Sequence, residues 1–218
     1  MPERLTSRRK ALVKIYGLFE KWAKDFDFAC EKGCATCCTQ SVTMTTLEGK
    51  LIHAYIKSDP ELLPLLDHLP ENSPTPAATT NRFALACLQG EETPEEDQPW
   101  NLNPCIFLRD NCCTIYPVRS FMCRSFGSRV PCHLTGSAEV DPLFLTLNTV
   151  IMQCIEHLDQ GRPWGNMNTI LRSLAGPGNK ESKSTLTAEP IPGLLIPPDE
   201  AEKLGAQLNI LMGIIRKR

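Results

Sequence analysis

The chain has 218 residues, 42% of them hydrophobic, with a formal net charge of -2 and a pI near 6.1. This length suits one domain with an appendage, and the hydrophobic content is enough to bury an ordinary core. The balanced charge excludes the broad positive field that draws a protein to nucleic acid or to an anionic membrane, so we expect neither partner.

The sequence also indicates a reducing compartment. Its basic first residues lead into an amphipathic pattern rather than into the apolar core and cleavage site of a signal peptide. The longest apolar stretch, Pro142 to Ile155, contains polar residues and is shorter than the ~20 apolar residues of a membrane-spanning helix. We therefore expect a cytoplasmic protein whose cysteines stay free as thiolate ligands rather than forming disulfides.

The first part of the chain is predicted to be helical around one cysteine-rich loop. Apolar residues recur at helical spacing from Ser7 to Phe26 and predict a helix there. Residues 41–45 favour a short extended piece. A threonine followed three residues later by glutamate has the pattern of a capping box and opens a helix over Thr45–Lys57. A shorter helix follows over Asp59–His68.

The middle of the chain combines loops with short elements. A loop is expected at 69–80, followed by a helix over Thr80–Leu88 and a solvated acidic loop over Gly90–Pro104. Residues Cys105–Ile115 favour a β-hairpin with a polar turn, and Pro117 then starts a short helix through Cys123.

The last part is predicted to contain three helices. A good cap opens a long apolar helix over Asp141–Asp159, and a further helix covers Asn166–Ala175. Residues 176–197 are rich in Gly, Pro and Ser and are predicted to be a linker. Residues 198–218 form an amphipathic helix, whose apolar stripe either folds back on the core or docks a protein partner or a second copy of the chain.

These elements predict a mainly α fold with irregular cysteine-rich loops and one small β-hairpin. The fold is expected to be a single metal-centred domain over residues 1–175, followed by the linker and the C-terminal helix. Because so much of the middle is loop, bound metal is expected to contribute directly to folding.

The first cysteine group is Cys30-x3-Cys34-x2-Cys37-Cys38. It offers at least three thiolates within one tight loop, as a metal or cluster requires when several soft ligands converge on one point. Because adjacent side chains project differently, Cys37 and Cys38 are expected either to serve different metals or to leave one of the two outside the ligand shell.

The second group is Cys105-x7-Cys113-x9-Cys123-x8-Cys132. Its spacing is too wide for a self-contained zinc ribbon, which would carry two C-x2-C pairs. We expect these four cysteines to complete sites that the first group begins, so that all eight are candidate metal ligands.

The other cysteines and the histidines refine this prediction. Cys154 lies inside an apolar helix and is expected to be core, whereas Cys87 and Cys112 lie near expected ligands and are held in reserve. Only His133 adjoins either group. Eight thiolates without histidine suit one or two 4Fe-4S clusters and also permit zinc, and we favour iron-sulfur.

Three segments together resemble a known family. They are Cys30-x3-Cys34-x2-Cys37-Cys38, Pro104-Cys105-Ile-Phe-Leu, and Cys113-Thr-Ile-Tyr116-Pro-Val-Arg119-Ser-Phe-Met-Cys123-Arg124-Ser-Phe126. The family is the YkgJ-type, or CxxCxxCC, group of zinc- or iron-chelating domains, and the resemblance covers Cys30 to Cys132. The chain departs from its pattern in the longer gap after Cys30 and in Ser120, where the family has proline.

The resemblance implies metal or cluster binding by the eight cysteines. The flagellin lysine N-methylases are similar in this domain, which there implies an iron-sulfur cluster and methyl transfer from S-adenosylmethionine. An S-adenosylmethionine-dependent methyltransferase-like enzyme is therefore the alternative, although no Gly-rich strand-turn-helix site is visible in the sequence.

Two arginines are candidate cofactor-binding residues. Arg119 and Arg124 flank Cys123, where fixed cations would offset the negative charge of a thiolate-ligated cluster. The alternative is that they form salt bridges with the acidic loop.

The predicted function is therefore a cysteine-ligated iron-sulfur protein with a role in electron transfer, sensing or another redox step. The methyltransferase-like enzyme is the alternative, and a zinc-stapled interaction module without turnover is a further one. Neither the substrate nor a catalytic residue follows from the sequence.

Overall fold

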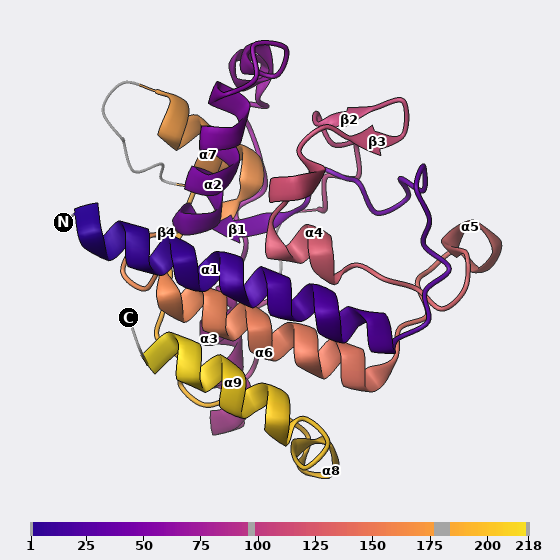
Figure 1. Cartoon of the computed structure of the whole chain (residues 1–218), viewed down its shortest axis with the longest axis vertical. Coiled ribbons are helices and arrows are strands. Elements are labelled where there is room, and N and C mark those ends of the chain that lie inside the picture. Colours follow the sequence, from indigo (N-terminus) through magenta and orange to yellow (C-terminus); the bar gives the residue numbers. More distant parts are fainter. Residues whose placement is uncertain (1, 96–98, 177–183, 217–218) are drawn as a thin grey trace.

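A computed structural model describes residues 2–95, 99–176 and 184–216, in which helices predominate. Three helices, α1 (Pro2–Trp22), α6 (Pro142–Leu158) and α9 (Gly205–Arg216), lie side by side (Figure 1). Their apolar stripes meet in the larger core, which includes Leu12, Ile15, Phe19, Leu147, Ile151, Leu158, Leu211 and Ile215. The amphipathic C-terminal segment thus folds back on the core, which is the first of the two alternatives predicted from its apolar stripe.

The first cap predicted from the sequence is confirmed. Helix α2 (Thr46–Lys57) opens with a capping box, in which Thr45 Oγ1 accepts from Glu48 N at 3.2 Å and Glu48 Oε2 accepts from Thr45 N at 2.9 Å. Helix α6 likewise has Asp141 as its N-cap, accepting from Leu143 N at 2.9 Å. These local signals fix where both helices begin.

Three shorter helical elements complete the first half of the fold. Two are 3₁₀ helices, η1 (Ala23–Asp25) and η2 (Leu63–His68), and the second replaces the helix expected over Asp59–His68. Helix α3 (Thr80–Gln89) is capped by Thr79 and ends at Gly90, whose φ of 68° is left-handed. The acidic loop after it lies partly outside the described residues.

A three-stranded antiparallel sheet was not predicted. It consists of β1 (Thr43–Thr45), β4 (Pro163–Asn166) and β5 (Leu186–Thr187) in the order β1-β4-β5. The expectation of a single β-hairpin was therefore wrong. The β4 sequence Pro-Trp-Gly-Asn contains three turn-forming residues and no alternation, so only its long-range pairing makes it a strand.

The predicted hairpin exists but is shorter than expected. It pairs β2 (Leu108–Arg109) with β3 (Cys112–Cys113). The two loop residues, Asp110 and Asn111, have φ values of 50° and 57°, the left-handed pair that a two-residue hairpin turn requires. Asp and Asn tolerate this conformation better than other non-glycine residues.

The helix predicted over Pro117–Cys123 is divided. A 3₁₀ helix, η3 (Tyr116–Val118), is followed by α4 (Phe121–Ser125), with an extended backbone at Arg119 and Ser120 between them. Helix α5 (Cys132–Thr135) then forms a short separate turn that ends at Gly136. The division leaves the N–H of Phe121 free to bind a buried carboxylate.

Residues predicted as a linker lie against α6. Residues 177–183 are outside the described part of the chain, but β5 pairs with β4, and the backbone N–H groups of Glu189 and Leu195 donate to Glu156 and Gln153 of α6. Helix α7 (Met167–Ala175) precedes this segment and α8 (Pro198–Ala201) follows it. Two buried polar residues of α6 thus hold the segment between β5 and α8 in place, although its Gly- and Pro-rich sequence shows no helical or strand periodicity.

A second core lies between α2, α7 and the hairpin. It contains Ile52, Ile56, Phe107, Ile115 and Ile170, none more than 2% exposed. Phe107 and Ile115, which flank the hairpin strands, are buried in this core, so the hairpin packs on the rest of the domain. Within the described ranges no helix is long and apolar enough to cross a membrane.

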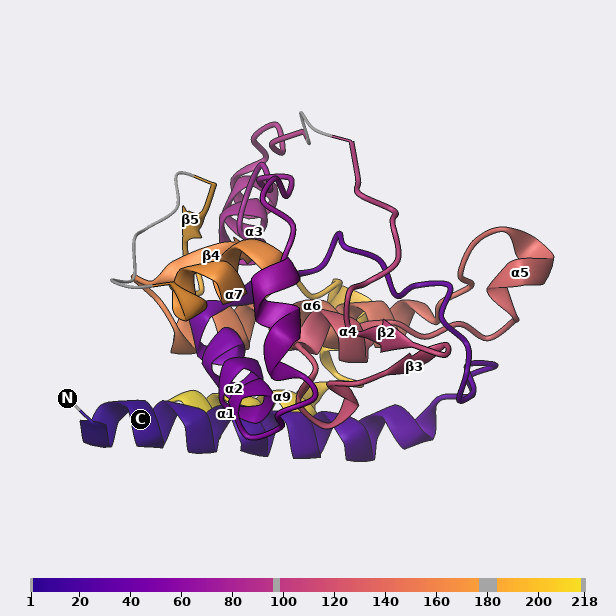
Figure 2. The ribbon, with the colours of Figure 1, turned by 90° about the horizontal axis from the view of Figure 1, so that it is seen from above.

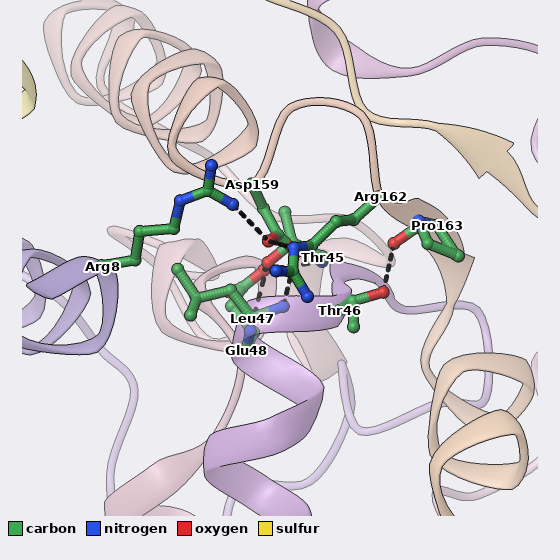
Figure 3. Close-up of polar contacts among 8 residues, drawn as sticks. All are labelled: Arg8, Thr45, Thr46, Leu47, Glu48, Asp159, Arg162 and Pro163. Atoms are coloured by element: carbon green, nitrogen blue, oxygen red, sulfur yellow. Dashed lines mark hydrogen bonds and ion pairs between the residues drawn. The ribbon is translucent and has the colours of Figure 1, made fainter. Parts of the chain in front are cut away.

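A buried carboxylate joins the ends of four elements (Figure 3). Asp159 Oδ2 accepts from Leu47 N at 2.6 Å, and Oδ1 lies 3.8 Å from Arg8 Nη1 and 3.4 Å from Arg162 Nε. Thr46 Oγ1 donates to Pro163 O at 2.6 Å beside it. Burial raises the pKa of Asp159 to about 6. The junction connects α1, α2, α6 and β4.

The pH dependence of stability tests this junction. The raised pKa means that the folded protein holds a proton that the unfolded chain releases, so stability falls as the pH rises from about 4 to about 6. Asp159→Asn keeps an acceptor for Leu47 N but does not titrate. Across that range, urea unfolding should show wild type losing up to about 3 kcal/mol relative to Asp159→Asn.

The matched disruption is Asp159→Ala, which leaves the buried Leu47 N–H without an acceptor. It should lower the free energy of unfolding by about 1–3 kcal/mol below that of Asp159→Asn at neutral pH. A difference between wild type and Asp159→Asn that does not change with pH would contradict the raised pKa.

Candidate metal centre

The two cysteine groups meet at one cavity. The segment between α1 and β1, which carries the first group, runs past α5 and then past the β2-β3 hairpin, which belong to the second (Figures 1 and 2). Between them lies a cavity of about 520 Å³. Eight of the eleven cysteines line it: Cys30, Cys34, Cys37, Cys38, Cys105, Cys112, Cys113 and Cys123. Seven of these were predicted as ligands.

Turns hold the first group in place. Cys34 N donates to Glu31 O at 3.0 Å, and Gly33 between them has a left-handed φ of 95°. A second turn follows, in which Cys38 N donates to Ala35 O at 2.9 Å. The side chains of Cys30, Cys34 and Cys37 are exposed. The first group is therefore a surface loop whose backbone is bent twice.

Backbone hydrogen bonds connect the end of this loop to the hairpin. Cys105 N donates to Cys38 O at 2.9 Å, and Thr39 forms an antiparallel bridge with Pro104. Leu108 N then donates to Cys105 O at 3.0 Å as the chain enters β2. Cys38 and Cys105 are thus held as neighbours by the main chain itself.

Cys123 is held by helix α4. Ser120, whose side chain is buried, donates through Oγ to Cys123 Sγ at 3.5 Å. The first N–H of α4, that of Phe121, donates to Glu48 Oε1 at 2.7 Å. Ser120 thus supplies a hydrogen bond to the cysteine sulfur.

Cys132 lies outside the cavity lining. It is half-buried at the start of α5, close enough that its charge acts on the thiol of Cys30. A backbone hydrogen bond connects the segments that precede Cys30 and Cys132, because Ala29 N donates to Ser128 O at 2.8 Å. The structure therefore places Cys132 beside the first group and away from the hairpin.

The remaining cysteines separate clearly. Cys154 is fully buried in the larger core, as its apolar helix predicts. Cys87 is exposed on α3 and does not line the cavity. Cys112, on the β3 side of the hairpin turn, does line it. All eleven cysteines are free thiols.

Burial keeps several of these thiols protonated. It raises the pKa of Cys105 to about 11 and that of Cys123 to about 12, although Ser120 opposes the second shift. The pair Cys37 and Cys38 is different, because a hydrogen bond between the two side chains raises the pKa of Cys37 and lowers that of Cys38. Metal binding must therefore displace protons from most of the site.

The two predicted arginines line the cavity but bind protein groups. The Arg119 guanidinium stacks 3.6 Å from the Tyr116 ring and donates to Tyr116 O at 2.8 Å. Arg124 is 6% exposed and donates to Arg119 O at 3.0 Å and Pro117 O at 2.8 Å. It also pairs with Glu20 of α1, and within the described part of the chain no ion pair joins it to the acidic loop.

A buried network behind Arg124 was missed by the sequence analysis. Arg124 lies 4.2 Å over the Tyr16 ring, and Tyr16 Oη donates to Glu48 Oε1 at 2.8 Å. Burial, and then the charge of Glu48, raise the pKa of Tyr16 well above its ordinary value. The capping-box pattern identifies the local role of Glu48, but nothing local in the sequence shows that Tyr16 and Phe121 also bind it.

The thiols surround the cavity rather than meeting at a point. In the ranges 2–95, 99–176 and 184–216, no three Cys, His, Asp or Glu side chains are gathered closely enough to hold a single metal ion as they stand. The donor set is nevertheless soft, reduced and rich in thiols, which is the chemistry of zinc and iron-sulfur ligation. The residues present therefore fit such a group, with side-chain rotation needed to close the shell.

Compared with protein-family models, with curated proteins and with solved structures, this chain has no match.

Arg124→Lys tests whether the arginine positions the site. Lysine carries the charge but not the planar fork that binds Glu20, Pro117 O and Arg119 O at once, so buried acceptors lose their donor. We expect a loss of about 2–4 kcal/mol in the free energy of unfolding. Chemical denaturation measures it.

The control is Arg129→Lys, since Arg129 is exposed in the loop before α5. It should change stability by no more than about 0.5 kcal/mol. Labelling of Cys123 by a thiol reagent should be faster in Arg124→Lys than in the control, and equal rates and stabilities in the two variants would refute the positioning role.

Proposed function

We propose that this chain is an iron-sulfur protein whose cysteine thiolates hold the cluster and which acts in electron transfer, sensing or another redox step. The observation that carries the proposal is the cavity lined by eight cysteines from two segments that lie far apart in the sequence. Apart from Cys112, every cysteine that lines it was singled out from the sequence as a ligand.

The size of the cavity supports a cluster over a single zinc ion. Structural zinc sites need no cavity, because four ligands meet at about 2.0–2.3 Å from the ion. A space of about 520 Å³ walled by thiols instead has room for a group of several atoms. A cluster supplies a one-electron change, and hydrogen bonds and solvent exposure at its sulfurs tune the potential.

The resemblance to the CxxCxxCC chelating domains supports the same proposal. Its two departures remove no thiolate, and Ser120 adds a donor to Cys123. The proposed ligands are therefore Cys30, Cys34, Cys37, Cys38, Cys105, Cys113, Cys123 and Cys132. Their free thiols suit a reducing compartment, and the cytoplasm is the proposed location.

The methyltransferase-like alternative has no support beyond the resemblance. The sheets within the described residues are small and antiparallel, whereas a nucleotide-type site is formed at the end of a parallel strand before a helix. A zinc site is the other alternative, and measurement of the bound metal distinguishes it from an iron-sulfur cluster.

Anaerobic purification tests the proposal. Wild-type protein should be brown, with broad visible absorption that dithionite bleaches, and should contain iron and acid-labile sulfide in equal amounts. Cys34→Ser should lose a large share of both, because it removes a thiolate from the exposed loop.

The matched control is Cys87→Ser, which removes an equally exposed cysteine outside the cavity. It should retain the wild-type content of iron and sulfide. Colourless protein loaded with zinc would overturn the iron-sulfur assignment, and equal iron loss in both variants would overturn the assignment of the site.

A further inference from the structure

We infer that the eight cysteines form two separate four-thiolate sites, an inference that rests on the proposed metal-binding function. The inner site lies between the loop end, the hairpin and α4 and consists of Cys38, Cys105, Cys113 and Cys123. The outer site lies between the loop and α5 and consists of Cys30, Cys34, Cys37 and Cys132.

The inner site is assembled by backbone pairing. The hydrogen bond from Cys105 N to Cys38 O and the bridge between Thr39 and Pro104 fix two of its cysteines side by side. The hairpin places the third cysteine, Cys113, beside them. Cys113 pairs with Leu108, which lies only three positions after Cys105 in the sequence. Three thiols from separate turns of chain are thus held at one end of the hairpin.

Helix α4 supplies the fourth ligand of the inner site. Cys123 lines the same cavity as Cys38, Cys105 and Cys113. Ser120 holds the Cys123 sulfur, and the hydrogen bond from Phe121 N to Glu48 fixes the start of the helix. The inner thiols are half-buried, and Cys105, Cys113 and Cys123 pack against the second apolar core.

The outer site forms where the start of the loop meets the irregular segment before α5. A Cβ at Gly127 would lie 2.6 Å from the Phe28 ring, so the two segments touch directly. The hydrogen bond from Ala29 N to Ser128 O continues this contact toward Cys30. The turns at Glu31–Cys34 and Ala35–Cys38 keep Cys34 and Cys37 on the same exposed loop as Cys30, beside the helix that begins at Cys132 (Figure 2).

Exposure distinguishes the two sites. Cys30, Cys34 and Cys37 are exposed on a turn-rich loop, and the short α5 helix carries the fourth ligand. The inner thiols lie behind them, where Arg119 and Arg124 also line the cavity. Since the shell around a site controls solvent access, metal in the outer site should exchange faster than metal in the inner site.

Cobalt(II) is the probe, because thiolate-bound tetrahedral cobalt absorbs visible light and reports each filled site. Reduced, metal-free, full-length protein is titrated with cobalt(II) chloride without oxygen. Wild type should bind two equivalents, whereas Cys113→Ser and Cys132→Ser should bind one each. The control Cys87→Ser should bind two, and circular dichroism checks that every variant folds.

Double variants give the decisive result. Cys30→Ser with Cys132→Ser removes two ligands of the same site and should still bind one equivalent, whereas Cys113→Ser with Cys132→Ser should bind none. EDTA should remove cobalt at least about tenfold faster from Cys113→Ser, which retains the outer site, than from Cys132→Ser.

The outcomes separate the two proposals. Wild type that binds one equivalent, or a Cys30 and Cys132 double variant that binds none, overturns the two-site inference and leaves metal binding intact. Wild type that binds no cobalt and, after anaerobic purification, carries no iron overturns the proposed function as well.

Discussion

The buried carboxylate of Glu48 is the contact on which the rest of the structure depends. It accepts from Thr45 N at the start of α2, from Tyr16 Oη of α1 and from Phe121 N at the start of α4. A carboxylate that is 4% exposed persists only if its oxygens are satisfied, so the burial of Glu48 requires all three elements to come together. Because α4 carries Cys123, the same contact ties a proposed metal ligand to the hydrophobic core.

The cysteine-rich half of the fold has little apolar packing of its own. The loop after α1 and the short α5 helix contribute no fully buried side chain within residues 29–38 and 132–135, the described parts that carry the outer cysteines. Their order comes from turns, from one hydrogen bond to Ser128 and from the thiols. In such a region the free energy of metal binding is also free energy of folding. The two apolar cores, by contrast, are complete without it.

Local signals predicted the parts of the fold that are determined locally. The capping box at Thr45, the Asp141 cap and the turn at Asp110 were all visible, because each depends on residues a few positions apart. Strand β4 and the segment after β5 were missed, since their structure comes from pairing with distant chain and from the buried Glu156 of α6. Most of the cysteines that line the cavity were singled out from the sequence, but the presence of Cys112 in its lining and the place of Cys132 outside it were not, because hydrogen bonds across 60 to 100 residues place these segments.

The hydrogen bond between Cys37 and Cys38 has a thermodynamic consequence for metal uptake. The raised pKa of Cys37 and the lowered pKa of Cys38 mean that Cys37 keeps the proton and Cys38 accepts it. Because a thiol binds metal as the thiolate, any metal that used both sulfurs would have to release this proton, and acid would oppose its uptake.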